Sequence, residues 1–600
     1  MRSTSKQSGA IGSKRARQRR VSTTSTGVDT IRAWIVSVYE FSDPHRLDCP
    51  FWPPDLFAVV GSILRRTGSY CRIYKTPAPF RNGRRRVDSK PMAFDSARKT
   101  GDSWRRNIQR HATRKVPDLS TAIPKQVLNW WKVLSMSFNS SFGAFDNLAD
   151  GSSTCPIQAA ISLVIAADQA SAGVGISHHV TRDSSAPIDF FLMFAHQRLS
   201  SDETLFRSLC LRIPPERLAV LPKQHTPQTG LTFRSLTHHL ALCPSGEIQA
   251  RWYGPTDTRT RRSDNRLNIL ILPWPLEVLA ADFQYQSIAA TENPKTGAFT
   301  YAPRSMLGPK ALADWVKRSI NCAMSRGATI DVVVFPEASL NLMEYYYVEK
   351  AVVKAGCMLI AGVRLEPRDS NAQAPVNSCA LQTRGLFDRS RTNWELLEST
   401  RYVQTKHHRW LLDPRQIMQY GLGTRLPADR AIWENIALPS RPLNFINLDD
   451  MTWCALICED LARQEPASEI MRAVAPNMVV ALLMDGPQHK DRWSARYASG
   501  LADDPGSSVL TVTNLGFVLR SKRLDQSNSV PRDAVIALWR DAIGGPQEID
   551  MRADHTACVL TLVVQGRQEY SADGRGDGGN AYHPTYAGHE SFRVDPRYRA

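Results

Sequence analysis

The pattern of apolar and polar positions changes character near residue 264. Beyond it, short apolar runs of the kind that form buried strands alternate with segments of helical period, starting with the run "LNILILPW". A helix is predicted from Pro309, with Leu312, Trp315, Val316, Ile320, Ala323 and Met324 on one stripe and Gly327 at its end. Further strands are predicted at 329–335, 357–363, 452–458, 477–484 and 507–514, and further helices at 343–356, 466–476 and 491–502. This alternation predicts an α/β fold, followed by strands alone at 534–541, 546–551 and 556–564.

The first 262 residues give a mixed α+β pattern that precedes this region. Residues 1–27 are polar, basic and without period, which is typical of a disordered basic arm. A basic N-terminal region is predicted at 28–119. The helical and mixed domain predicted at 120–262 has helices at 124–138 and 156–171 and strands at 188–195, 217–221 and 247–253. The Gly/Pro/Thr/Arg-rich stretch 254–266 indicates the boundary with the domain at 263–567, and 568–600 is predicted to be a flexible tail.

The positive charge of the chain is local. The formal net charge is +18, and residues 1–120 hold 25 Lys and Arg against 9 Asp and Glu. Within them, residues 81–118 carry 12 basic and 4 acidic side chains. Such a segment fits a phosphate-binding surface for DNA or RNA, and in the absence of a recognisable nucleic-acid-binding module it fits a solvated basic loop better. Both interpretations stay open.

Cysteine spacing and hydropathy bear on the cellular environment. The 11 cysteines form no CxxC pair and no regular spacing, so neither a disulfide framework nor a metal site is predicted. No apolar run reaches the roughly 18 residues of a membrane span, and the N-terminus lacks the apolar region of a secretory signal. We expect a cytoplasmic protein with reduced thiols and no membrane partner.

Three residues stand where strands of an α/β sheet end, which is where such folds place reacting groups. Glu337 follows "DVVVFP" and is either a desolvated general base or an acid capping the next helix. Cys458 ends "TWCALIC" and is either a nucleophile or a buried core thiol, as expected of Cys454. Lys406, in "RYVQTKHHRW", is either a solvated charge or the cation that stabilises a developing oxyanion. His407 and His408 are interpreted as structural residues rather than metal ligands.

The segments "VVVFPE", "Y..TKHH" and "LICED", in this order and at these separations, resemble the Glu-Lys-Cys signature of the nitrilase superfamily, the carbon-nitrogen hydrolases. Similar matches around Asn377, Trp493 and Asn514 extend the resemblance over about residues 264–567. It implies an α-β-β-α sandwich that often pairs into a homodimer, with no cofactor. It also implies Glu337 as general base, Lys406 as stabiliser and Cys458 as the nucleophile that forms a thioester.

The resemblance implies further site residues and one departure. The backbone amide of Glu459 would assist the oxyanion, and Asp413, Gln416 and Trp493 are candidates for substrate binding. Family members often carry a second glutamate after the lysine, and the segment "LLDPRQIMQYGLG" offers only Asp413 as an acid. We therefore expect either that Asp413 substitutes for it or that the chemistry is altered.

These observations favour a hydrolase acting on a carbon-nitrogen bond, with an amide as the first choice of substrate and a nitrile or ureido group as the second. Transfer of the acyl group to an amine uses the same thioester and stays open. The alternative is a nucleic-acid-associated regulatory or defence protein, in which residues 1–120 bind DNA or RNA and the hydrolase-like half is an effector or scaffold.

Overall fold

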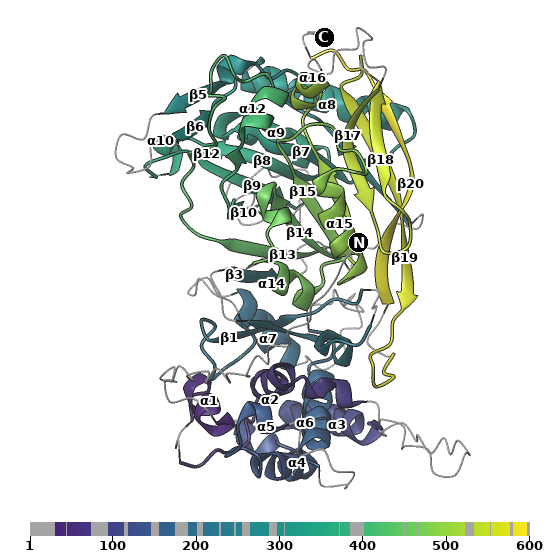
Figure 1. Ribbon diagram of the computed structural model, residues 1–600. Helices are drawn as coiled ribbons and strands as arrows, with labels where there is room; N and C mark the ends of the chain where they lie inside the picture. Colours follow the sequence, from purple (N-terminus) through teal and green to yellow (C-terminus); the bar gives the residue numbers. More distant parts are fainter. Residues whose placement is uncertain are drawn as a thin grey trace, which may run out of the picture.

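A computed structural model describes residues 30–41, 43, 45–73, 94–112, 118–145, 155–174, 190–200, 208–226, 230–244, 248–254, 265–286, 297–304, 306–370, 372–383, 401–448, 451–465, 467–522, 533–552, 554–576 and 580–596. The helices of the first 200 residues gather at one end of the molecule, and two facing sheets form the rest (Figure 1). The predicted basic arm at 1–27 lies outside the described residues, as do 74–93 and 113–117 of the basic region.

The N-terminal end is built around one buried helix. Its helices are α1 (Ile31–Val38), α2 (Pro53–Thr67), α3 (Asp95–Ala112), α4 (Lys125–Ser135), α5 (Phe142–Phe145), α6 (Pro156–Ala170) and α7 (Phe190–Ser200). Helix α6 is apolar on nearly every face, so α2, α3 and α4 all pack against it. At Gly101 of α3, a Cβ atom would lie 2.6 Å from the carbonyl oxygen of Ala166, which fixes how closely the two helices approach.

The predicted helices at 124–138 and 156–171 are confirmed, but the strand predicted at 188–195 is wrong. Residues 190–195 lie in α7, where Phe191, Ala195 and Leu199 are buried at intervals of four residues, and residues 188 and 189 lie outside the described residues. The period becomes visible only when the window is extended past the apolar run "IDFFLMFA" into the polar residues that follow it.

Three strands follow the helices. β1 (Leu218–Pro222) and β2 (Leu240–Pro244) form an antiparallel pair. β1 confirms the strand predicted at 217–221. β3 (Gln249–Tyr253) instead pairs in parallel with β13 (Pro442–Leu448) of the C-terminal half. The predicted boundary at 262/263 therefore falls after a strand that belongs to the C-terminal sheet, and the helical region and that sheet are joined.

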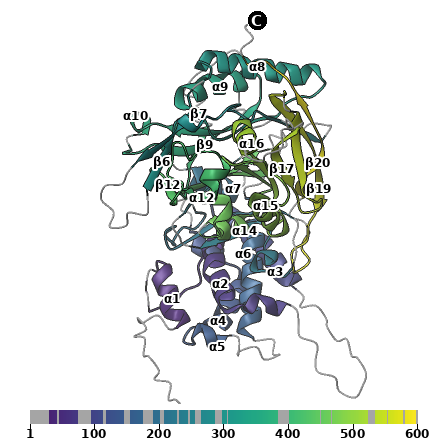
Figure 2. The same ribbon diagram turned by 45° about the horizontal axis from the view of Figure 1, so that its top comes forward.

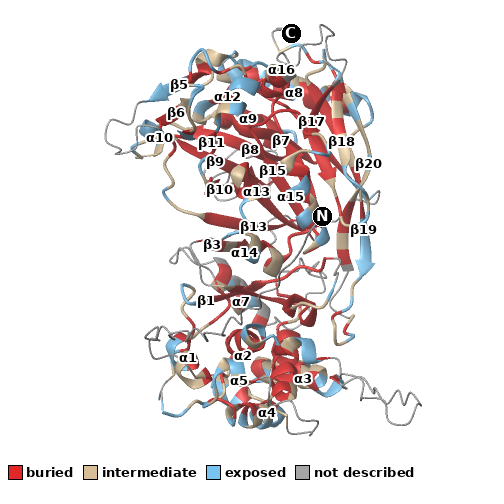
Figure 3. Ribbon diagram, in the orientation of Figure 1, coloured by how far each residue is buried: buried red, intermediate tan, exposed pale blue. Residues whose placement is uncertain are grey.

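Two seven-stranded sheets face each other in the C-terminal half. The first has the order β10-β9-β8-β7-β4-β19-β20 and the second β18-β17-β16-β15-β14-β13-β3. Their remaining bounds are β4 (Arg266–Ile271), β7 (Val332–Asn341), β8 (Met358–Leu365), β9 (Val376–Gln382), β10 (Arg401–Thr405), β14 (Met451–Ile457), β15 (Met478–Leu482), β16 (Ser508–Val512), β17 (Asp533–Arg540), β18 (Gln547–Arg552), β19 (Ala557–Gln568) and β20 (Asn580–Phe592). Alternate side chains of both sheets, such as Val332 and Val334 against Trp453 and Ile457, form the core between them. The strands of both sheets are largely buried (Figure 3).

Helices cover the outer face of each sheet. α8 (Pro309–Ser325) and α9 (Leu342–Lys354) pack on the first sheet, and α14 (Ala467–Val474) and α15 (Trp493–Asp503) pack on the second (Figure 2). The helix-sheet-sheet-helix order confirms the predicted α-β-β-α sandwich. A small sheet of β5 (Phe283–Gln286), β6 (Gly297–Tyr301), β11 (Leu411–Leu412) and β12 (Ile432–Glu434) shares an apolar cluster with α12 (Pro414–Gln419) and α16 (Leu515–Lys522). The short helices α10 (Pro367–Ser370) and α13 (Glu459–Ala462) contact β8 and β14.

The N-terminal helices and the second sheet share one apolar core. Buried residues of α2, α6, β1 and β2 form a single cluster with buried residues of α14, α15, β14 and β15. Helix α14 packs directly on β2. The N-terminal region thus covers the helix layer of the second sheet (Figure 1).

The tail predicted at 568–600 is wrong for most of its length. Residues 580–592 form β20, which pairs with β19 along its full length and closes the edge of the first sheet. Just before it, Arg575 is 3% exposed and its guanidinium lies 2.8 Å from the carboxylate of Asp168 in α6. Asp168 also accepts the backbone N–H groups of His238, His239 and Leu240. In the described residues, no helix has the length and apolarity needed to cross a membrane.

Candidate active site

Glu337 lies in a bulge of β7. The pairing of β7 with β8 shifts register between Phe335 and Leu340, and Ala338 within the bulge has φ +50°. The bulge presses on β8 at Gly362, where a Cβ atom would lie 2.2 Å from the carbonyl oxygen of Pro336. The bulge turns the side chain of Glu337 into the interior, where this residue is 1% exposed. The capping alternative is wrong, because Asn341 caps α9.

Lys406 follows β10 and is completely buried, so it is not a solvated charge. Its Nζ lies 2.8 Å from Oε1 of Glu337 and 2.7 Å from Oε2 of Glu434. The side-chain amide of Asn377, on β9, donates to Oε1 of Glu337 at 2.8 Å and to Oε1 of Glu434 at 3.3 Å. Four side chains from four strands or strand ends therefore form one buried network.

Glu434 is the residue that sequence reasoning missed. It lies 28 positions after Lys406, on β12, beyond the segment in which we expected the second acid. Asp413 instead caps α12 in a reciprocal pair of hydrogen bonds with Gln416, and its side chain is exposed. Neither of these two predicted residues joins the network. Burial alternates along this strand, with Ile432 and Glu434 buried and the intervening Trp433 41% exposed, but the letters "IWE" show no such alternation in the sequence.

Cys458 connects β14 to α13. Its φ of +46° is rare for a residue with a side chain, and its backbone N–H donates to the carbonyl of Leu482 at 2.9 Å. The thiol is 4% exposed, while Cys454 on the same strand is a core thiol, as predicted. The Cys458 thiol lies within electrostatic reach of Glu337, whose carboxylate raises the pKa of the thiol. The other oxygen of Glu337, Oε2, accepts no hydrogen bond from the described residues.

Burial governs the protonation of the three groups. It raises the pKa of the Glu337 carboxyl, an effect that Lys406 opposes and Glu434 increases. Burial alone would lower the pKa of Lys406, but Glu337 and Glu434 together hold it well above its ordinary value. Burial and the Glu337 carboxylate raise the pKa of the Cys458 thiol well above its ordinary value. The resting site therefore holds a protonated thiol beside a carboxylate and an ammonium group.

His407 and His408 have a structural role. The carboxylate of Asp460 accepts both of their backbone N–H groups at 3.0 to 3.1 Å and lies 2.9 Å from Nδ1 of His408. His407 Nε2 lies 2.7 Å from the carbonyl oxygen of Pro442. These contacts fix the loop that carries Lys406. No group of three His, Cys, Asp or Glu within the described residues is arranged to hold a metal ion.

Trp493 belongs to a second polar cluster beside the thiol, centred on Asp485. The carboxylate of Asp485 accepts Trp493 Nε1 at 2.9 Å, Arg492 at 2.6 Å and the hydroxyl of Tyr420. Asp485 also contributes to the raised pKa of Cys458. Sequence reasoning found Trp493 and missed Asp485, which follows the apolar end of β15.

Glu459 begins α13 directly after the nucleophile. Its carboxylate pairs with Arg463 at 2.7 Å, one helical turn further on. The side chain is thereby engaged outside the Lys406 network. Its predicted contribution is that of its backbone N–H alone.

No protein-family model and no curated protein matches this chain. Among solved structures, an amidase from Nesterenkonia sp. is similar at 10% identity and a TM-score of 0.29, over 50% of this chain and 92% of its own. The similar structures are nitrilase-superfamily proteins. A CN-hydrolase superfamily protein, XC1258 from Xanthomonas campestris, matches at 12% identity and TM-score 0.28 over 49% of this chain and 90% of its own. Nit3 of Saccharomyces cerevisiae, of the nitrilase superfamily, matches at 12% identity and TM-score 0.27 over 48% and 88%.

Proposed function

We propose that this protein hydrolyses the carbon-nitrogen bond of a small carboxamide through a thioester on Cys458. The observation that carries the proposal is the buried network itself. A thiol, a carboxylate and an ammonium group, spread over 121 positions of the chain, lie together at the ends of strands. The three groups supply a nucleophile, a base and a cation for the developing oxyanion, which is the set that acyl transfer requires.

The protonation states define the order of proton transfers. Because the thiol is protonated at rest, Glu337 takes its proton as sulfur bonds to the carbonyl carbon. Glu337 then gives that proton to the leaving nitrogen, and ammonia departs as the thioester forms. In the second half of the reaction, the oxygen of a water molecule attacks the thioester while Glu337 takes a proton from that water. Glu337 then gives this proton to the thiolate as the carboxylic acid leaves.

Lys406 has a donor left for the oxyanion. An ammonium group carries three N–H donors, and Glu337 and Glu434 occupy two of them. The third is free to stabilise the tetrahedral intermediate, together with the backbone N–H of Glu459. Glu434 keeps the ammonium charged and in place. Since Cys458 is only 4% exposed, we expect a short, unbranched substrate rather than a peptide.

Labelling with iodoacetamide tests the proposal, because this electrophile carries the amide group of the expected substrate. We expect peptide mapping to find Cys458 modified in the wild type, and its labelling to fall at least about 100-fold in Lys406→Met and Glu337→Gln. Cys71→Ser, which removes an exposed thiol elsewhere, is the matched control. Failure of Cys458 to label, together with no ammonia release from small amides, nitriles or ureido compounds, contradicts the proposal.

The charge of α3 supports a second candidate function, nucleic-acid binding. Lys99, Arg106 and Arg110 are exposed on one face of this helix. A gel shift of the full chain with duplex DNA and RNA, at 50 and 200 mM salt, tests it. Binding that weakens steeply with salt, and that Arg106→Gln/Arg110→Gln reduces, supports this function, and no binding at 50 mM salt excludes it.

The cytoplasm is the proposed location, which the 11 free thiols support.

A homodimer is also proposed. Because β2 of the N-terminal region already packs on α14, a second copy must use a surface other than that face of α14. Light scattering measures the mass.

A further inference from the structure

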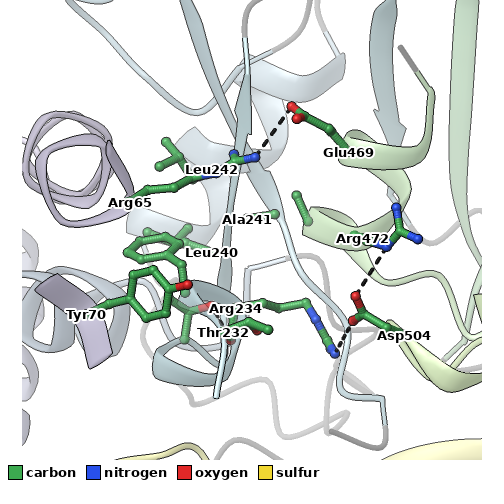
Figure 4. A pocket seen from close by; sticks show the side chains of 13 residues that line it. Arg65, Tyr70, Thr232, Arg234, Leu240, Ala241, Leu242, Glu469, Arg472 and Asp504 are labelled. Atoms are coloured by element: carbon green, nitrogen blue, oxygen red, sulfur yellow. Dashed lines mark hydrogen bonds and ion pairs between the residues drawn. The ribbon is translucent and has the colours of Figure 1, made fainter. Parts of the chain in front are cut away.

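A cavity of about 340 Å³ lies where the N-terminal region meets the C-terminal half, away from the catalytic network. Its walls come from the end of α2, the turn at 232–237, β2 and α14 (Figure 4). The volume is within the range of small-molecule binding sites. Four segments that are distant in the sequence thus meet around one pocket that is open to solvent on one side.

Three arginines line this cavity, one from each of three walls. Arg65 ends α2, Arg234 lies in the turn and Arg472 lies on α14 (Figure 4). Two carboxylates face them, so the lining carries a formal charge of +1. Three guanidinium forks around one space are a suitable set for an oxyanion, because each can donate two parallel hydrogen bonds.

The ion pairs inside the cavity engage only some of the five N–H donors that each guanidinium carries, although Arg234 also donates to Thr226 at 3.0 Å and Arg472 donates to Ser468. Arg65 lies 3.5 Å from Glu469, and Arg234 lies 3.5 Å from Asp504. Asp504 is also shared with Arg472, at 3.2 Å. These separations exceed those of strong charge-assisted hydrogen bonds. Burial also lowers the pKa of Arg234, which an anion beside its guanidinium would counteract.

The opposite side of the cavity is apolar. Tyr70 and Phe233 place their rings edge to face, with centroids 6.3 Å apart, and Leu240, Ala241 and Leu242 of β2 continue this wall. The hydroxyl of Thr232 lines the same space. An apolar wall opposite a set of arginines selects a ligand with a charged end and a flat apolar body.

We propose that this cavity binds a small aromatic oxyanion, with its carboxylate or phosphate held by Arg65, Arg234 and Arg472 and its ring against Tyr70 and Phe233. The site is separate from the proposed amide hydrolysis and does not depend on it. It lies next to α14, the second helix after Cys458, so the ligand would hold the N-terminal region against the catalytic half.

Calorimetric titration of the full chain at low salt tests the site, with benzoate and phenyl phosphate as probes and benzyl alcohol as the neutral one. We expect saturable binding of at least one anion, no binding of the alcohol, and weaker binding as salt is added. The anion that binds with the lower dissociation constant identifies the preferred oxyanion. Binding of neither anion overturns the proposal, and so does equal binding of benzyl alcohol.

Variants locate the site. Arg65 and Arg472 have side chains 37% and 39% exposed, so we expect Arg65→Met and Arg472→Met to fold and each to weaken binding at least about tenfold. Arg326→Met removes a comparably exposed arginine of α8, paired with Glu590, and should bind as the wild type does. Ala473→Trp, which fills the cavity and keeps the arginines, should abolish binding. Wild-type affinity in Arg65→Met, Arg472→Met and Ala473→Trp would overturn the proposal.

Discussion

Replacing Lys406 by methionine removes the only cation in contact with the Glu337 and Glu434 carboxylates among the described residues. The wild-type lysine is fully buried and makes two hydrogen bonds to charged groups, at 2.7 and 2.8 Å. Each such bond contributes about 1.5–3 kcal/mol. Removing one partner of a buried ion pair costs about 3–5 kcal/mol, because the remaining charge is left uncompensated. We therefore expect the free energy of unfolding to fall by about 3–5 kcal/mol at pH 8.

The loss should depend on pH in a defined direction. Lys406 opposes the rise in the pKa of Glu337, so its removal raises that pKa further. The folded variant then binds a proton more tightly than the unfolded chain does, and stability is lost as pH rises from the ordinary carboxyl value of 4.5 through the raised pKa. The deficit should be smaller at pH 5 than at pH 8. Neutralising the acid, in Lys406→Met/Glu337→Gln, should restore part of the stability at pH 8.

Urea unfolding of the full chain, followed by far-UV circular dichroism at both pH values, measures these differences. The control is Lys317→Met, whose lysine is 53% exposed and lies 3.7 Å from Asp314. It should change stability by less than about 0.5 kcal/mol. A Lys406→Met protein as stable as this control at pH 8, or with equal deficits at pH 5 and pH 8, would refute the reasoning.

Three further predictions follow from the site and its frame. Because burial raises the pKa of Glu337 above the ordinary carboxyl value of 4.5, the rate of ammonia release should decline on acidification at a pH higher than 4.5. A rate that stays constant down to pH 4.5 would count against Glu337 as the base. Asp460→Asn weakens the hydrogen bonds that the backbone N–H groups of His407 and His408 donate to this side chain. It should lower the free energy of unfolding by about 1–3 kcal/mol and reduce the rate of Cys458 labelling. Gly362→Ala forces a Cβ atom into the β7 bulge and should cost about 1–3 kcal/mol, whereas Gly500→Ala, in open space on α15, should be neutral or stabilising by up to about 1 kcal/mol in the same urea titration.

The strands and helices of the C-terminal half could be predicted because their apolar runs are buried on both faces or carry a clear helical stripe. Of the three proposed reacting residues, Glu337 and Cys458 could be located because each follows such a run, and Lys406 through the resemblance of "Y..TKHH". In contrast, Glu434 lies on a three-residue strand, too short to show a period, and its partner Lys406 is distant in sequence. Pairing across the fold, which no local pattern records, brings the two together.

The ends of the sandwich were harder to predict for the same reason. β20 contains proline and glycine, which are atypical of central strands and tolerated at the edge that it forms. β3 agrees with the strand predicted at 247–253, but only its register with β13 assigns it to the second sheet. In both cases the strand is stabilised by residues far away in the chain.

The ion pair between Asp168 and Arg575 joins two residues that the ribosome makes at very different times. The acid emerges with α6, whereas its guanidinium partner is made 407 residues later. Before residue 575 is made, this carboxylate has the backbone N–H groups of His238, His239 and Leu240 and the charge of the nearby Lys223 as its favourable surroundings. A chain that ends before residue 575 would therefore lack the guanidinium that pairs with Asp168 in the completed core.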